Sequence, residues 1–145
     1  LLIFYTGKQR LNKGILDEQD KSTKSNNAEV LNSLHYIKES GYKILEIIET
    51  GDLDELGIMF KDHWEMKKKL SSGVSNKYFD SIYNHAIENG ALGGKISGAG
   101  GGGFFTFYCS SHHEKLIKKM DKLGLKQLDF DFDFNGSQII SPNNN

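Results

Sequence analysis

The sequence predicts an α+β fold in which an antiparallel sheet is covered by helices on one face. Three observations lead to this class: short apolar runs, longer stretches with helical spacing, and one strictly alternating segment near the C-terminus. Their order along the chain is strand, helices, two strands, helix, strands. Strands and helices grouped in this way are typical of a two-layer α+β domain rather than of a parallel sheet.

Composition indicates one globular domain. The chain has 145 residues, of which 37% are hydrophobic and 26% charged, enough to bury a core. The formal net charge of −1 gives no electrostatic reason to expect nucleic acid or an acidic membrane as a partner. Cys109 is the single cysteine, which excludes an internal disulfide and fits a reducing cytoplasm. Because the chain starts without Met inside a strand-like run, we expect a piece of a longer protein.

The N-terminal part is predicted to be a strand followed by helices. Residues 1–7 form a short apolar run closed by glycine, and residues 11–21 are weakly helical before a loop over 22–27. A long helix then starts at Ala28, capped by Ser25 or Asn26, and ends at Gly51 in a left-handed cap. Its apolar face follows steps of three and four: Val30, Leu34, Ile37, Gly41, Ile44 and Ile48. Glycine on that face indicates a close helix contact or a break.

Two further helices are predicted before the central strands. Asp52 opens the first, and its apolar side carries Leu53, Leu56, Phe60 and Trp64. Asn76 caps the second, and Gly90 ends it. The apolar side of this helix carries Phe79, Ile82, Tyr83, Ala86 and Ile87.

The C-terminal part is predicted to hold strands at 93–97 and 104–109, separated by a glycine loop. Ser110 or Ser111 caps a last helix that carries Leu116, Ile117 and Met120, and Gly124 stops it. Residues 126–134 alternate strictly, so we expect a strand with one buried face made of Leu128, Phe130, Phe132 and Phe134. A turn at 135–137, a short strand at 138–140 and a frayed tail follow.

Several familiar site motifs are absent on inspection. Asn89 and Ile96 stand where a Walker phosphate loop needs Gly and Ser or Thr. The spacing G-x-G-x-x-G in 98–103 leads into a strand, whereas the dinucleotide fingerprint opens a helix. The aspartates of 129–133 resemble a calcium loop, but Phe134 replaces its required glycine. His112 and His113 are interpreted as surface residues, and no metal site is expected.

The glycine loop is the strongest candidate site. A tight connection between strands needs only one or two glycines, so a longer run indicates that the backbone approaches a ligand closely or exposes several N–H groups to an anion. Phosphate is the usual anion at such a site; a purely structural connection is the alternative. The candidate residues are Ser97, Gly98, Ala99, Gly100, Gly101, Gly102 and Gly103.

The stretch "GGKISGAGGGGFF" resembles the third conserved motif of the GHMP kinases, a family of small-molecule kinases. "YTGKQR" near the start, "HWEMKKKLSSGVSN", and "FDSIYNHAIENGALGGKISGAGGGGF" resemble the branch of that family that acts on heptose 7-phosphate. The resemblance implies that residues 1–145 are the family's C-terminal domain, a ferredoxin-like two-layer sandwich. It also implies a separate N-terminal domain, absent from this chain, that carries the ATP phosphate loop and the acidic catalytic or Mg²⁺-binding residue.

The implied reaction moves the γ-phosphoryl of ATP to the anomeric hydroxyl of heptose 7-phosphate. ATP and Mg²⁺ would be bound largely by the N-terminal domain, so this chain supplies no catalytic residue and is expected to be inactive alone. Candidates for the substrate phosphate are Lys67, Lys68, Arg10 and Lys95; for the lysines, a solvated surface charge is the alternative. Two alternative functions remain: another GHMP sugar or small-molecule kinase, and a non-enzymatic ferredoxin-like module that binds a phosphorylated ligand. Valine at Gly100 or Gly101 is expected to block phosphate while leaving the domain folded.

Overall fold

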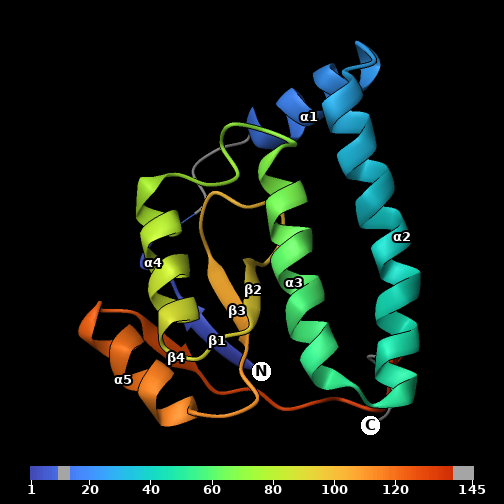
Figure 1. Ribbon diagram of the computed structural model, residues 1–145. Helices are drawn as coiled ribbons and strands as arrows, with labels where there is room; N and C mark the ends of the chain where they lie inside the picture. Colours follow the sequence, from blue (N-terminus) through green and yellow to red (C-terminus); the bar gives the residue numbers. More distant parts are fainter. Residues whose placement is uncertain (10–13, 139–145) are drawn as a thin grey trace, which may run out of the picture.

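The computed structural model describes residues 1–9 and 14–138. Four strands form one antiparallel sheet in the order β2-β3-β1-β4 (Figure 1). They are β1 (Leu2–Tyr5), β2 (Gly93–Ile96), β3 (Phe104–Tyr108) and β4 (Lys126–Leu128). Two helices, α4 (Lys77–Glu88) and α5 (His113–Lys122), lie between the strands as in a split βαβ, ferredoxin-like fold. The predicted α+β, ferredoxin-like class is confirmed.

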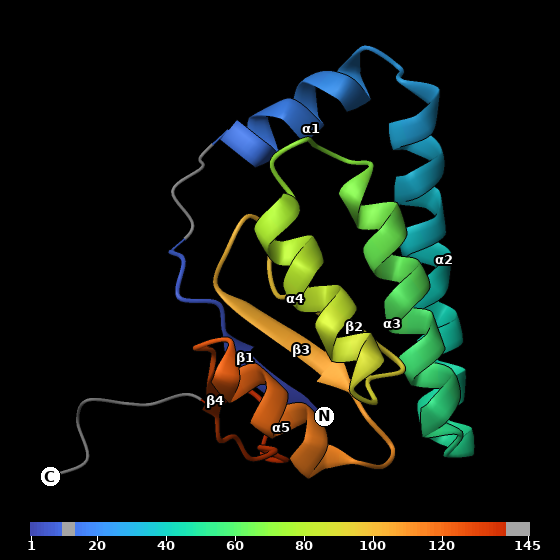
Figure 2. The ribbon, with the colours of Figure 1, turned by 60° about the vertical axis from the view of Figure 1, so that its left-hand side comes forward.

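Three more helices, α1 (Gly14–Lys24), α2 (Ala28–Thr50) and α3 (Leu53–Lys68), separate β1 from α4. Helices α4 and α5 lie across one face of the sheet, and α3 packs along β2, the edge strand (Figure 2). Helix α2 runs antiparallel to α3 on its outer side, and α1 crosses the end of this pair. None of the helices in the described ranges is both long and apolar enough to cross a membrane.

The main core lies between the sheet and helices α3, α4 and α5. Trp64 contributes the largest buried side chain and stacks on Tyr83, with ring centroids 6.3 Å apart. Phe105 meets Trp64 edge to face from the sheet, at 5.8 Å. A smaller apolar cluster of Ile47, Leu56 and Met59 joins α2 to α3. The helical hairpin α2–α3 is therefore attached to the sheet through α3.

Three helix ends lie where they were predicted, and one helix cap does not. Asn76 and Asp52 cap α4 and α3 as predicted, and Gly51 ends α2 at a φ of +83°. The cap of α2 is Asn27, not Ser25 or Asn26: its Oδ1 accepts from the N–H groups of Glu29 and Val30. Asn26 itself has a φ of +56°, outside the extended range that an N-cap residue adopts.

The predicted apolar face of α2 is partly wrong. Ile48 is 56% exposed and Gly41 is exposed within an unbroken helix, with no atom of the described residues within 4 Å of an added Cβ. Ser33 and Ser40 are buried instead, because their hydroxyls donate to helix carbonyls one turn back and are satisfied there. The contact with α3, and not apolar character alone, therefore decides which residues of α2 are buried.

The C-terminal predictions need two corrections. Helix α5 begins after His112, whose φ is +61°, and neither Ser110 nor Ser111 caps it; His112 makes no capping hydrogen bond with its side chain in the described structure. Strand β4 stops at Leu128, and the face predicted to be buried is exposed: Leu128 by 45%, Phe130 by 40%, Phe132 by 65% and Phe134 by 93%. Leu128 pairs with Ile3 near the start of β1, so the alternating segment runs past its partner strand. Residues 135–137 bend as predicted, while most of the predicted strand at 138–140 and the tail lie outside the described residues.

Candidate phosphate-binding site

The glycine loop between β2 and β3 has a backbone that other residues rarely adopt. Gly98, Gly100, Gly101, Gly102 and Gly103 all have positive φ, from +73° to +143°. Side chains with a Cβ are strained in this region of conformational space. The conformation of the loop, and not flexibility alone, therefore requires the run of glycines.

The rear of the loop packs against the turn that follows α3. The N–H of Gly101 donates to the carbonyl of Val74 at 2.9 Å. A Cβ on Gly100 would lie 2.8 Å from that same oxygen, and a Cβ on Gly101 would lie 2.7 Å from Cδ1 of Ile15. Valine at either position would therefore disturb packing as well as phosphate approach. The expectation that such variants stay folded remains a prediction, and the crowding adds an expected loss of stability to the expected loss of turnover.

That turn is itself tied to α1. The Glu18 carboxylate accepts from the Ser71 hydroxyl at 2.6 Å and from the Ser72 N–H at 3.2 Å. The hydrogen bond from Ser71, followed by the one from the Ser72 backbone, lowers the pKa of Glu18. Helix α1, the turn and the rear of the glycine loop therefore form one connected support.

The end of the loop is held from the opposite side. Gly103 donates its N–H to the carbonyl of Lys8 at 2.9 Å, and its own carbonyl accepts from the N–H and hydroxyl of Thr6. Tyr78, at the start of α4, donates its hydroxyl to the Thr6 carbonyl at 2.8 Å. The middle of the loop, at Gly101, and its end, at Gly103, are therefore held by residues distant in sequence.

Four N–H groups of the loop make no hydrogen bond to the described residues, and two of them, on the exposed Gly98 and the half-buried Ala99, are available to a ligand. Those of Gly98, Ala99, Gly100 and Gly102 have no acceptor among residues 1–9 and 14–138. Around Gly98, no described atom lies within 4 Å of where a Cβ would be. Successive backbone N–H groups held in this way are suited to bind an anion.

Ser97 places its hydroxyl 3.2 Å from that of Thr106, which pairs with Lys95 across the strands. Ser97 and Lys95 thus share a face, as predicted.

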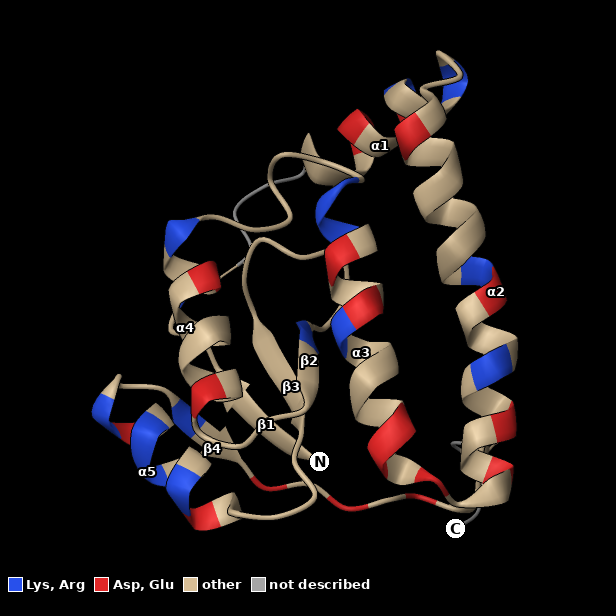
Figure 3. Ribbon diagram, in the orientation of Figure 1, with Lys and Arg blue, Asp and Glu red and all other residues tan. Residues whose placement is uncertain are grey.

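Lys67 joins the end of α3 to the start of the loop. Its side chain is 8% exposed, and Nζ donates to the carbonyl of Ile96 at 3.0 Å and to the carbonyl of Gly98. Lys68 points elsewhere, and its ammonium pairs with Glu65 at 2.9 Å. Figure 3 shows basic residues at this end of α3. The structure thus separates the two predicted lysines: Lys67 is buried against the loop, and Lys68 lies in a surface ion pair. Arg10 lies outside the described residues.

A cleft of about 510 Å³ opens beside the loop, between α1, α2, α3 and β2. The predicted residues that it brings together are Lys67, Lys95, Gly98 and Ala99. Lys95 lies with its ammonium 5.4 Å from the centre of the Phe60 ring, and burial lowers its pKa. The rest of the lining is apolar or neutral: Leu16, Gln19, Leu34, Ile37, His63 and Leu70. Two cations and open N–H groups in one cleft favour a phosphate ligand.

His63 is the residue of this cleft that the sequence analysis missed. It lies on α3 one turn before Lys67, a spacing of four that places both side chains on one face of the helix. Burial, followed by the charges of Lys95 and Lys67, lowers the pKa of His63 to about 4. The spacing of four from Lys67 could have indicated that His63 lies beside it. This places His63 at the site only once Lys67 is known to face the loop.

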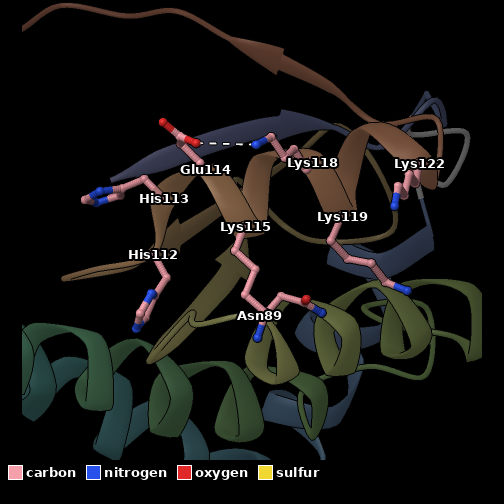
Figure 4. Close-up of a pocket in the computed structure, with 8 residues that line it drawn as sticks. All are labelled: Asn89, His112, His113, Glu114, Lys115, Lys118, Lys119 and Lys122. Atoms are coloured by element: carbon pink, nitrogen blue, oxygen red, sulfur yellow. Dashed lines mark hydrogen bonds and ion pairs between the residues drawn. The ribbon is translucent and has the colours of Figure 1, made fainter.

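A second hollow, of about 680 Å³, lies between α5 and the end of α4, at Asn89 (Figure 4). It is lined by His112 and by residues of α5, among them His113, Lys115 and Lys119, and the side chain of Lys115 extends toward Asn89. None of the glycine-loop residues lines it. In the part of the chain that the structure describes, no group of three or more His, Cys, Asp or Glu side chains could share a metal ion.

The fold and the loop define the class of protein: a ferredoxin-like domain with a glycine-rich loop suited to phosphate. The family model described as "GHMP kinases C terminal" matches residues 44–125, which include α3, α4, β2, the loop, β3 and α5. The chain belongs to the GHMP kinase family.

Individual relatives agree with this assignment. The chain is 35% identical over 132 residues to D-glycero-alpha-D-manno-heptose 7-phosphate kinase from Campylobacter jejuni subsp. jejuni, covering 90% of this chain and 38% of the relative. It is 37% identical over 103 residues to L-fucokinase/L-fucose-1-P guanylyltransferase from Bacteroides fragilis, covering 71% of this chain and 11% of that protein. The fold is similar to that of L. major mevalonate kinase in complex with R-mevalonate, with a TM-score of 0.75, 20% identity and coverage of 83% and 37%. The chain thus spans well under half of the length of each relative.

Proposed function

We propose that this chain is the C-terminal domain of a sugar kinase that transfers the γ-phosphoryl group of ATP to the anomeric hydroxyl of heptose 7-phosphate. The observation that supports this best is the cleft in which the open N–H groups of Gly98 and Ala99 lie beside Lys67 and Lys95. The similarity to a heptose 7-phosphate kinase over 90% of the chain supports the substrate.

In this proposal the glycine loop contacts the phosphoryl group in transfer, and the cleft binds the substrate phosphate. Phosphoryl transfer depends chiefly on positioning and on stabilising charge over the transferred group. Backbone N–H groups suit this because, without a Cβ, they can approach phosphoryl oxygens closely. The anomeric oxygen forms a bond to the γ-phosphorus as the bond to ADP breaks, and its proton passes to a base outside this chain.

The cleft does not fit Mg²⁺. That ion takes oxygen ligands, chiefly carboxylates, water and substrate phosphates, whereas the described lining of the cleft offers lysines, an imidazole and no carboxylate. We therefore assign Mg²⁺, the ATP phosphate loop and the catalytic base to an N-terminal domain, and expect the full-length protein to act in the cytoplasm.

The test is ATP-dependent phosphorylation by the full-length protein. Heptose 7-phosphate, the same heptose without its phosphate, L-fucose and mevalonate are offered in parallel, with ADP release as the readout. We expect turnover with heptose 7-phosphate and none by the 145-residue chain alone. Turnover only with another acceptor would replace the proposed substrate, and absence of ADP release with every acceptor would favour a non-enzymatic binding module.

A further inference from the structure

The imidazole of His63 has two nitrogens in very different surroundings. Nδ1 is fully enclosed and has no hydrogen-bond partner in the described part of the chain. Nε2 is not enclosed in this way, and the residue lines the cleft between the loop and α1. A proton on Nδ1 would be buried without an acceptor, which is costly. The favoured tautomer therefore carries its proton on Nε2, toward the cleft.

Burial first, and then the charges of Lys95 and Lys67, lower the pKa of His63 and keep the ring neutral. Lys67 lies on the same helix face, Lys95 reaches the cleft from β2, and both disfavour a third positive charge. The lining contributed by α1 and α2, namely Leu16, Gln19, Leu34 and Ile37, brings no charge. His63 therefore offers a hydrogen-bond donor without adding to the repulsion between the two ammonium groups.

We propose that His63 binds the non-reacting phosphate of the sugar phosphate, donating its Nε2–H to a phosphate oxygen between Lys67 and Lys95. This inference rests on the proposed function. A phosphate is the group that the two lysines attract, and a neutral third donor increases the number of hydrogen bonds to it without further charge. His63 is then a specificity-determining residue that separates phosphorylated from unphosphorylated sugars.

The test uses the full-length protein and calorimetric titration with heptose 7-phosphate in the absence of ATP. His63→Leu removes the donor, His63→Gln replaces it with an amide that reaches the Nε2 position, and His63→Asn places an amide only as far as Nδ1. Since a hydrogen bond to a charged group is worth roughly a factor of ten or more in affinity, we expect the Kd to rise about tenfold in the Leu and Asn variants. The Gln variant should stay within about threefold of the natural protein.

Binding of the unphosphorylated heptose, and the exposed-histidine control His35→Leu, should be unchanged. Equal affinity for the sugar phosphate in all variants would overturn the inference, as would an equal loss for both sugars. Should the Leu variant not fold, the comparison of Gln with Asn decides, and equal Kd values for these two would count against the inference. Because affinity is measured without ATP, sugar-phosphate binding without turnover refutes the proposed kinase activity alone. Normal turnover with an unchanged Kd refutes the role of His63 alone.

Discussion

Alanine substitutions at two glycines of the same loop should separate packing from ligand contact. Both Gly98 and Gly100 have positive φ, +74° and +98°, so alanine at either position costs roughly 1–2 kcal/mol of backbone strain. Their surroundings differ. Gly98 faces open space, whereas a Cβ on Gly100 would lie 2.8 Å from the Val74 carbonyl oxygen and 2.9 Å from its Cγ1.

The contact with Val74 sets the size of the difference. Relief would require the turn after α3 to move, and overpacking of this kind costs typically 1–3 kcal/mol. The movement would also disturb the hydrogen bond from Gly101 to Val74, which lies at 2.9 Å. We therefore expect Gly98→Ala to destabilise the domain by about 1–2 kcal/mol and Gly100→Ala by about 2–5 kcal/mol.

The assay is native-state hydrogen exchange of the β3 amides in the full-length protein, which reports the free energy of opening of this domain. Kinetics on the same samples measure function. Gly98→Ala adds a methyl group beside open N–H donors, so its kcat/KM should fall at least tenfold while β3 stays protected. Equal protection losses in the two variants would refute the packing argument, and an unchanged kcat/KM for Gly98→Ala would refute the assignment of the loop as a phosphate site.

Three further outcomes are expected. Lys67→Met should raise the KM for heptose 7-phosphate at least tenfold, because a buried cation of the cleft is lost. The matched variant Lys68→Met removes only a surface ion pair and should change stability by less than about 1 kcal/mol. Equal effects of the two variants on the KM would contradict the separation of the two lysines. For His63, a folded-state pKa of about 4 against an ordinary 6.5 means that the unfolded state binds more protons between these values, so stability falls as pH drops through this window. At pH 5 the loss is at most about 2 kcal/mol, less after solvent screening, and chemical denaturation at pH 7.5 and 5 should show it in the natural protein and not in His63→Gln. Because the pKa of Glu18 is lowered, its contribution to stability is complete above the ordinary pKa of 4.5 and is lost as pH falls below that value. In thermal unfolding the natural protein should therefore be more stable than Glu18→Gln at pH 7, and the difference should shrink toward pH 3.

Features set by neighbouring residues could be predicted from the sequence. Asn76, Asp52 and Gly51 mark helix ends because capping is a contact between residues two to four apart. The glycine loop was recognisable for a similar reason: so many positive-φ positions in succession leave few residue types that can occupy them.

Features that depend on a distant partner could not be predicted in the same way. Strand β4 ends at Leu128, which pairs with Ile3 one residue from the start of β1, although the alternation continues to Phe134. Lys67 and Lys68 are adjacent and chemically identical, and only the direction in which α3 meets β2 decides which of them reaches the loop. His63 depends on the same packing.

The structure also explains why the loop needs so many glycines. Gly100 and Gly101 lie against the turn after α3, and their lack of a side chain allows that close contact. Gly98 and Gly103 meet no described atom where a Cβ would be, so their positive φ, not crowding, is what excludes other residues. Close packing at Gly100 and Gly101 fixes the position of the backbone, and the positive φ of Gly98 and Gly103 sets its conformation where no described atom is near. A phosphate site made of backbone N–H groups requires both, because donors stabilise a transferring phosphoryl group only when their positions are already fixed.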